Sequence, residues 1–196
     1  MKDQPIYHSI EAIILDRFEP EHRIPCMRIL HENHRVIRSA PGSLHNHQAW
    51  DGGYCDHVTD GLNLLIVLYE SLCRLRPLPF RLSSALLVYF LHDIEKPWKY
   101  ESRKEAVPAM LLAKKEDRHE FRMKKIAEYG IKLTDEELNA LQYTEGEGKD
   151  YSNLHRAMNE LAAFCHMADV ASARIWHDYP KESGRDEWVG AERAVG

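Results

Sequence analysis

Apolar residues recur at helical spacing along most of the chain. Leucines at positions 62, 65, 68 and 72 fall three and four residues apart, which places them on one face of a helix that begins near Tyr54. Residues 85–91 are apolar on every side, so a buried strand is an alternative there. A helix is favoured, because Val88 is the only β-branched residue in this run and polar residues precede it without a turn. No stretch alternates apolar and polar residues over strand length, and the pattern therefore predicts an all-α fold.

Polar residues and a glycine mark helix ends in the second half of the chain. Thr134 and Glu137 have the spacing of a capping box, in which each side chain accepts a backbone N–H at the start of a helix. Gly130 stands where the preceding helix, at about residues 119–129, needs a left-handed residue to end. These signals predict two consecutive helices separated by a short turn.

A long helix is predicted from about residue 150 to residue 177, with Asp150 or Ser152 as its N-cap. Its apolar stripe is formed by Leu154, Met158, Leu161 and Cys165. Residues 181–196 are polar and form a tail that carries little core signal. A length of 196 residues suits one domain, because two separate cores would be cramped in it. We therefore expect a single domain over residues 1–196.

Composition restricts the class of protein and its compartment. Hydrophobic residues make up 44% of the chain and charged residues 29%, as in a globular protein. The formal charge of −5 gives no overall attraction to nucleic acid, so extended duplexes are not expected partners. The four cysteines show no CxxC spacing and are expected to be reduced, as in the cytoplasm. The start of the sequence is interrupted by charges, and no apolar run is long enough for a membrane span.

Histidine is unusually frequent, with 12 residues, and this directs attention to metal or proton chemistry. His92 and Asp93 directly follow the apolar run of residues 85–91. A buried aspartate there would be costly unless a cation supplied the missing charge. His57 and Asp169 are further candidates, and Asp169 has no basic partner at helical spacing. Two imidazoles and two carboxylates suit one divalent ion: Mn²⁺, Fe²⁺, Co²⁺, Ni²⁺, Zn²⁺ or Mg²⁺.

The ordered set His57, His92-Asp93 and Asp169 resembles the H…HD…D signature of the HD superfamily of metal-dependent phosphohydrolases. The stretch before His57 is similar to the HD domain of bacterial 3′–5′ exoribonucleases in particular. The similarity covers about residues 40–177, and helices within residues 1–39 are expected to pack on this core. The resemblance implies a single all-α domain of the HD type. The matching residues before His57 are Ala40, Pro41, Gly42, Ser43, Leu44, His47, Ala49, Trp50, Gly52 and Gly53.

The resemblance implies a role for each residue of the signature. His57, His92, Asp93 and Asp169 would hold the ion. Asp93 would also act in catalysis, by holding the attacking water or accepting its proton. His119 resembles a later histidine that many members use for a second metal. A second, weaker site that involves Asp93 and His119 is therefore an alternative to a single ion.

Several positions depart from the family pattern. Gln48 stands where the second of two paired histidines is expected, and Glu95 replaces a glycine of the HDIGK motif. Residues 143–146 lack the His-His pair of many two-metal members. Either the site holds one metal ion, which we favour, or Glu145 or Glu147 replaces an imidazole.

The resemblance also implies hydrolysis of a phosphoester or phosphoanhydride in a nucleotide or short oligonucleotide. Lys96 would act in catalysis by contacting the phosphate. Cations interleaved with aromatic residues, among them Arg38, Lys96 and Trp98, suit a nucleotide because phosphates bind charge and bases stack on rings. His47 is expected either to touch the substrate or to fix its loop. His166 is expected to pack beside the ligands, with binding to a second metal as the alternative.

Two other function classes stay open. An HD-type diiron oxygenase would need two irons, and the lack of histidines near Tyr143 argues against it. A non-catalytic nucleotide-binding regulatory module would have no reason to keep a costly buried aspartate. A small nucleotide or short oligonucleotide is therefore the expected partner, and no membrane partner is expected. A homodimer would be unsurprising if a helix left an apolar face exposed.

Overall fold

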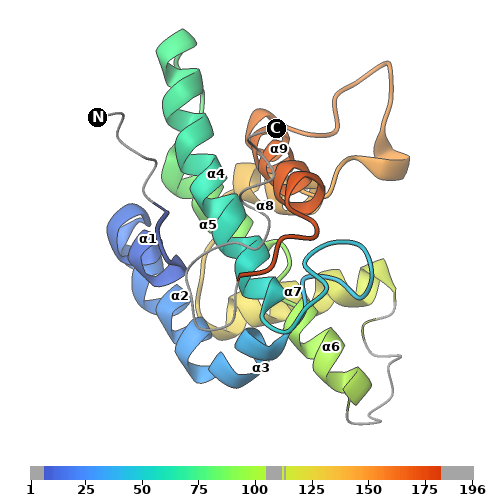
Figure 1. Ribbon diagram of the computed structural model, residues 1–196. Helices are drawn as coiled ribbons and strands as arrows, with labels where there is room; N and C mark the ends of the chain where they lie inside the picture. Colours follow the sequence, from blue (N-terminus) through green and yellow to red (C-terminus); the bar gives the residue numbers. More distant parts are fainter. Residues whose placement is uncertain (1–6, 105–111, 113, 182–196) are drawn as a thin grey trace, which may run out of the picture.

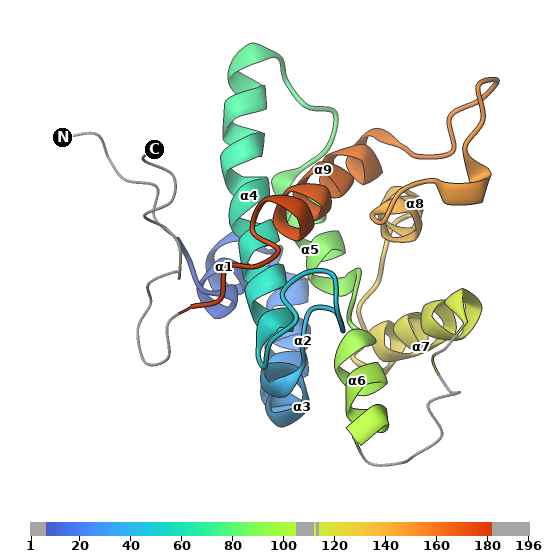
Figure 2. The ribbon, with the colours of Figure 1, turned by 45° about the vertical axis from the view of Figure 1, so that its right-hand side comes forward.

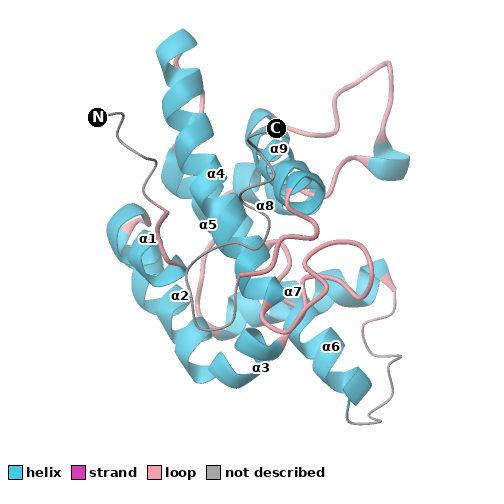
Figure 3. Cartoon of the chain, viewed as in Figure 1, coloured by secondary structure: helices cyan, strands magenta, loops and turns pink. Residues whose placement is uncertain are grey.

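The computed structural model describes residues 7–104, 112 and 114–181. Within these residues the chain is all-α and contains no β-strand, which confirms the predicted fold class (Figure 3). None of the described helices combines the length and apolar character that crossing a membrane requires. Residues 182–196 of the expected polar tail lie outside the described residues. The elements are α1 (Ile10–Arg17), α2 (Pro20–Glu32), α3 (His34–Ser39), α4 (Gly53–Leu75), α5 (Leu82–Leu91), α6 (Lys96–Lys104), α7 (Lys115–Glu128), α8 (Asp135–Tyr143), the 3₁₀ turn η1 (Gly148–Asp150) and α9 (Glu160–Ile175).

Helices α4 and α5 form the centre of the fold. Helix α4 contacts α1, α3, α5 and α9, and α5 contacts α1, α8 and α9 (Figures 1 and 2). Residues 85–91 of α5 are buried along their whole length. The helix predicted there is confirmed, and burial from all sides explains why its sequence shows no amphipathic period. The helix expected near Tyr54 begins at Gly53.

The helix-end signals between α7 and α8 are confirmed. The Thr134 hydroxyl accepts the backbone N–H of Glu137, and the Glu137 carboxylate accepts the backbone N–H of Thr134, as a capping box requires. Gly130, with φ +69°, follows α7 in the left-handed conformation. The next backbone N–H, from Ile131, donates to the carbonyl of Ile126 at 3.0 Å. This contact closes the end of α7.

The predicted start of the last helix was wrong. Helix α9 begins at Glu160, with Asn159 as its N-cap, and the residues from 151 to 159 form a loop. Leu154, which was expected in the apolar stripe, is 95% exposed. Side-chain contacts hold the loop instead, because the Glu147 carboxylate accepts the backbone N–H groups of residues 157 and 158. Spacing alone could not separate a helix from a loop whose apolar residues fall at helical intervals by coincidence.

Candidate metal centre

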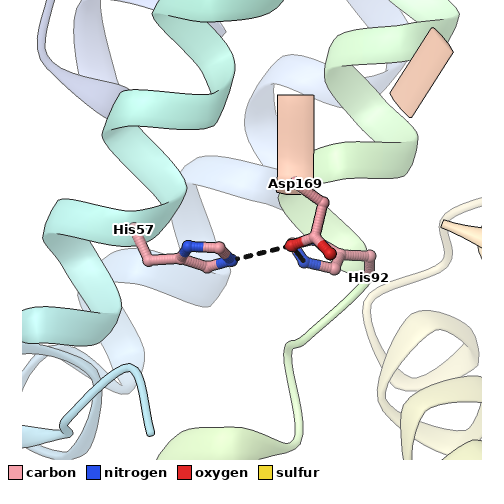
Figure 4. A group of neighbouring side chains, drawn as sticks. All are labelled: His57, His92 and Asp169. Carbon is pink, nitrogen blue, oxygen red and sulfur yellow. Dashed lines mark ion pairs between the residues drawn. The ribbon is translucent and has the colours of Figure 1, made fainter. Parts of the chain in front are cut away.

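Three residues that lie far apart in the sequence meet at one buried point (Figure 4). His57 comes from α4, His92 from the end of α5 and Asp169 from α9. Asp169 Oδ1 lies 3.2 Å from His57 Nε2 and 3.5 Å from His92 Nε2. One nitrogen or oxygen atom from each residue lies within 4.8 Å of the other two. Both imidazoles are fully buried, so this group has the donor atoms and the spacing that could bind a metal ion.

Asp93 adjoins this group and brings a second carboxylate to it. Asp93 Oδ2 lies 3.2 Å from His92 Nε2 and 3.7 Å from His57 Nε2. Lys96 Nζ forms an ion pair with the same oxygen. His92 and Asp93 occupy the turn between α5 and α6, and the bend of the backbone there lets adjacent side chains approach one point.

Each imidazole is held by a contact on its other ring nitrogen. His92 Nδ1 lies at hydrogen-bond distance from the backbone oxygen of Tyr89, and a carbonyl can only accept, so this nitrogen carries a proton. His57 Nδ1 lies 3.1 Å from the hydroxyl of Ser172. Both rings therefore direct Nε2 towards Asp169. Contacts of this kind orient imidazoles that bind metal ions.

Buried polar atoms without a hydrogen-bond partner occur on the cluster residues and on residues that pack near them. Native proteins leave few such atoms unsatisfied, and a group of them indicates a missing partner such as an ion or ligand. The imidazole of His47 lies 5.2 Å from that of His57, and the ring of Tyr89 lies 4.5 Å from that of His92, measured between centroids. In the described part of the chain the unsatisfied atoms are His47 Nε2, Gln48 Oε1, His57 Nε2, Tyr89 Oη, His92 Nε2 and Asp93 Oδ1.

Opposite charges inside the cluster shift the pKa values of its members. Burial lowers the pKa of His92, but the charge of Asp93 and the short contacts to the carboxylates of Asp169 and Asp93 raise it overall to about 10. Burial raises the pKa of Asp93, yet the charges of Lys96 and His92 bring it well below its usual range. Burial raises the pKa of Asp169, but the short contacts to the imidazoles of His57 and His92 outweigh it and lower this pKa overall. Both carboxylates are therefore ionised at neutral pH, as ligands of a cation must be.

Gly52 and Gly53 allow the loop of residues 40–52 to pack against the site. Gly52, with φ +84°, precedes α4 in a conformation that other residues rarely adopt. A Cβ atom on Gly53 would lie 1.9 Å from the backbone oxygen of Gln48. Only glycine permits this approach, which seats Gln48 and His47 beside the start of α4.

Replacement of Gly53 by alanine is expected to destabilise the chain by about 1–3 kcal/mol, the usual cost of overpacking. The added methyl group meets backbone rather than a flexible side chain, so the loop must shift and carry His47 away from His57. Chemical denaturation measures the stability, and titration with Mn²⁺ measures the effect on the cluster.

Gly130→Ala is the matched control. It also strains a glycine in the left-handed conformation, but the added methyl group would meet no atom within 4 Å. It should lower stability without changing the affinity for Mn²⁺. Equal affinities in the wild type and Gly53→Ala would contradict the close packing of the loop on the site.

Several residues predicted for the site lie elsewhere. His119 is exposed on α7 and Glu145 is exposed after α8, and within the described residues neither belongs to a group of three or more possible metal ligands. Glu147 uses its carboxylate to hold the loop before α9. His166 Nδ1 donates to the backbone oxygen of Thr144 at 2.8 Å, a packing role beside the site. These positions are reached by separate helices, and sequence order could not reveal where their side chains point.

Two residues predicted to bind substrate also lie outside the cluster. Arg38 forms an ion pair of 3.0 Å with Glu11 and lines a cavity of about 460 Å³ among α1, α2, α3 and α4. The ring of Trp98 packs 5.5 Å from that of Phe121 between centroids, and Lys125 Nζ lies 4.9 Å from the centre of the indole. Trp98 therefore joins α6 to α7. Of the residues predicted to contact substrate, Lys96 and His47 are the ones placed beside the cluster.

Sequence reasoning missed residues that support the cluster. Ser172 lies one turn after Asp169 on α9, so its spacing on that helix is a signal that could have found it. Arg122 forms a doubly hydrogen-bonded ion pair with Glu95, at 3.1 and 3.2 Å, and donates to the backbone oxygen of Leu141. This pair gives the buried Glu95 carboxylate a charged partner. No local pattern identifies Arg122 as its partner.

Comparisons of the chain with family models, curated proteins and solved structures found no match. The class of the site is therefore defined by its own geometry. Two imidazoles and two carboxylates surround one buried point, and a lysine pairs with one of the carboxylates. This arrangement is a candidate metal centre in an all-α protein.

Proposed function

We propose that this protein is a divalent-metal-dependent phosphohydrolase of the HD type that acts on a small nucleotide or a short oligonucleotide. One observation carries the proposal. His57, His92, Asp93 and Asp169 follow the H…HD…D order in the sequence and have side chains that converge on one buried point. Three buried atoms of these residues, His57 Nε2, His92 Nε2 and Asp93 Oδ1, have no hydrogen-bond partner, which supports a missing cation.

The donor set fits a single divalent ion. His57 and His92 would bind through Nε2, and Asp93 and Asp169 through carboxylate oxygens. A bound divalent ion lowers the pKa of its water and neutralises charge on phosphate oxygens. Asp93 is suited to hold and orient the attacking water, because its Oδ1 is buried and has no hydrogen-bond partner. Lys96 places a positive charge beside the cluster, which favours an anionic substrate.

The burial of the site favours a small substrate over a polymer. The His57 and His92 side chains are fully buried, and the Asp169 side chain is 17% exposed. His47 offers an unsatisfied Nε2 next to His57, so it can hydrogen-bond a group of the substrate that lies beside the ion. The net charge of −5 opposes binding of long nucleic acids.

A substrate screen tests the proposal. Purified chain would be incubated with Mn²⁺ and with nucleoside mono- and triphosphates, cyclic dinucleotides and short RNA. We expect cleavage of at least one of these classes and none in the presence of a chelator, because the water is activated only at the ion.

The metal content of the same preparation separates the possible outcomes. One ion per chain with a cleaved nucleotide supports the proposal. One ion without any cleavage would contradict the phosphohydrolase function and leave a metal-binding module. Two irons per chain with oxygen consumption would indicate the diiron oxygenase, and a chain that binds no divalent ion would refute the proposal altogether.

A further inference from the structure

Gln48 is buried between the loop of residues 40–52 and the end of α9. Its side-chain nitrogen lies 3.0 Å from the backbone oxygen of Ser172, 3.4 Å from the Ser172 hydroxyl and 3.4 Å from the backbone oxygen of Trp176. Backbone carbonyls only accept hydrogen bonds, so the donor end of the amide must face α9. Gln48 is therefore a donor towards Ser172.

Ser172 joins Gln48 to His57. The Ser172 hydroxyl oxygen lies 3.1 Å from His57 Nδ1 and 3.5 Å from the backbone oxygen of His57. A hydroxyl has one hydrogen to donate and two lone pairs to accept with. The Ser172 hydrogen can satisfy the His57 carbonyl while its lone pairs accept from Gln48 and from the imidazole. All three contacts are made together only when His57 Nδ1 carries the proton.

The cluster itself opposes this arrangement when no ion is bound. Asp169 Oδ1 lies 3.2 Å from His57 Nε2 and would attract a proton on that nitrogen. A proton there would block the lone pair that an ion needs. The tautomer of His57 therefore depends on whether Ser172, at Nδ1, or Asp169, at Nε2, is the stronger hydrogen-bond partner.

We infer that Ser172, oriented by Gln48, is a positioning residue that keeps the His57 proton on Nδ1 and leaves the Nε2 lone pair directed into the cluster. This inference rests on the proposed metal centre and deepens it. It assigns a task to the glutamine that departs from the histidine pair of the family pattern. The two residues act through His57, because neither is among the residues whose atoms form the metal-binding group.

Nitrogen-15 NMR of the histidine rings tests the inference on the metal-free chain. The spectra are recorded at about pH 8, because the protonated and unprotonated nitrogens of a neutral imidazole give distinct signals that show which one carries the proton. We expect the wild type to carry the proton on Nδ1. In Ser172→Ala we expect the proton to move to Nε2, where Asp169 accepts it. The same proton position in both proteins, or a proton on Nε2 in the wild type, would overturn the inference.

Metal affinity gives a second readout that does not depend on activity. Titration with Mn²⁺ should show weaker binding by about 10–100-fold in Ser172→Ala, the usual effect of removing a partner of a metal-binding imidazole. Gln48→Met, which leaves the hydroxyl in place, should weaken binding less and serves if Ser172→Ala does not fold. Unchanged affinity in a folded variant of either kind would contradict the positioning role.

Thr59→Val is the matched control. Thr59 lies on α4 two residues after His57, and its buried hydroxyl donates to the backbone oxygen of Cys55 at 2.6 Å. Its replacement removes a comparable hydrogen bond but should leave the His57 tautomer and the metal affinity unchanged. A wild type that binds Mn²⁺ but cleaves no nucleotide would refute the phosphohydrolase proposal and leave the tautomer result intact, so the two failures are distinguishable.

Discussion

Replacement of Asp93 by alanine is expected to abolish both the binding of a divalent ion and the phosphohydrolase activity that we propose. The variant loses the carboxylate that adjoins both imidazoles, and the Lys96 ammonium that remains repels a cation. Removal of a residue that only supports a ligand costs about 10–100-fold in metal affinity, so removal of this carboxylate should exceed about 100-fold. Elemental analysis and titration with Mn²⁺ measure the ion, and the nucleotide cleaved by the wild type measures the activity.

Two further variants show which property of Asp93 matters. Asp93→Asn keeps the volume of the side chain and removes its charge, so it should retain the fold and lose most of the affinity. Asp16→Ala removes an exposed carboxylate whose partner is the neighbouring Arg17, and it should change neither readout. An Asp93→Ala chain that retained its ion and its turnover would show that the cluster is not the active site.

The largest loss of stability is expected when Arg122 is replaced by leucine. Glu95 and Arg122 are both buried, with side chains 2% and 8% exposed, and each is the other's charged partner. Truncation of one member of a buried ion pair typically costs about 3–5 kcal/mol, because the other charge is left in an apolar environment. Chemical denaturation of the variant should show this loss in the free energy of unfolding.

The double variant Glu95→Gln/Arg122→Leu tests the cause. It removes the stranded carboxylate and should recover part of the stability lost in Arg122→Leu. Arg74→Leu, at an exposed position near the end of α4, is the matched control and should change the free energy of unfolding by less than about 0.5 kcal/mol. An Arg122→Leu chain as stable as the wild type would show that the pair is dispensable for folding.

Much of the helical framework could be predicted because it depends on local order in the sequence. The spacing of leucines in α4 and the capping box at Thr134 act within a few residues of one another. The start of α9 was mispredicted for the opposite reason. The loop before it is fixed by Glu147 and Asn139, whose side chains accept backbone N–H groups of residues 157–159. Such contacts depend on tertiary structure.

The residues of the candidate site were likewise predictable only in part. The order of His57, His92-Asp93 and Asp169 predicted which residues meet, because that order resembles the H…HD…D signature, whose residues converge on a metal ion. His119, by contrast, is exposed on α7 and is not part of the group of three possible ligands, and its role as a ligand stays a prediction. The supporting residues Ser172 and Arg122 act across helices that only the folded chain brings together.

The ion pair between Lys96 and Asp93 bears on whether the chain can fold before a cation binds to the cluster. An aspartate that is 1% exposed would hinder folding if its charge had to wait for a metal. The lysine supplies an internal substitute, so the newly synthesised chain can reach its native shape before it encounters any ion. Binding of a cation to the cluster would then be an exchange with the ammonium group in a chain that is already folded, and folding itself would not depend on the supply of metal.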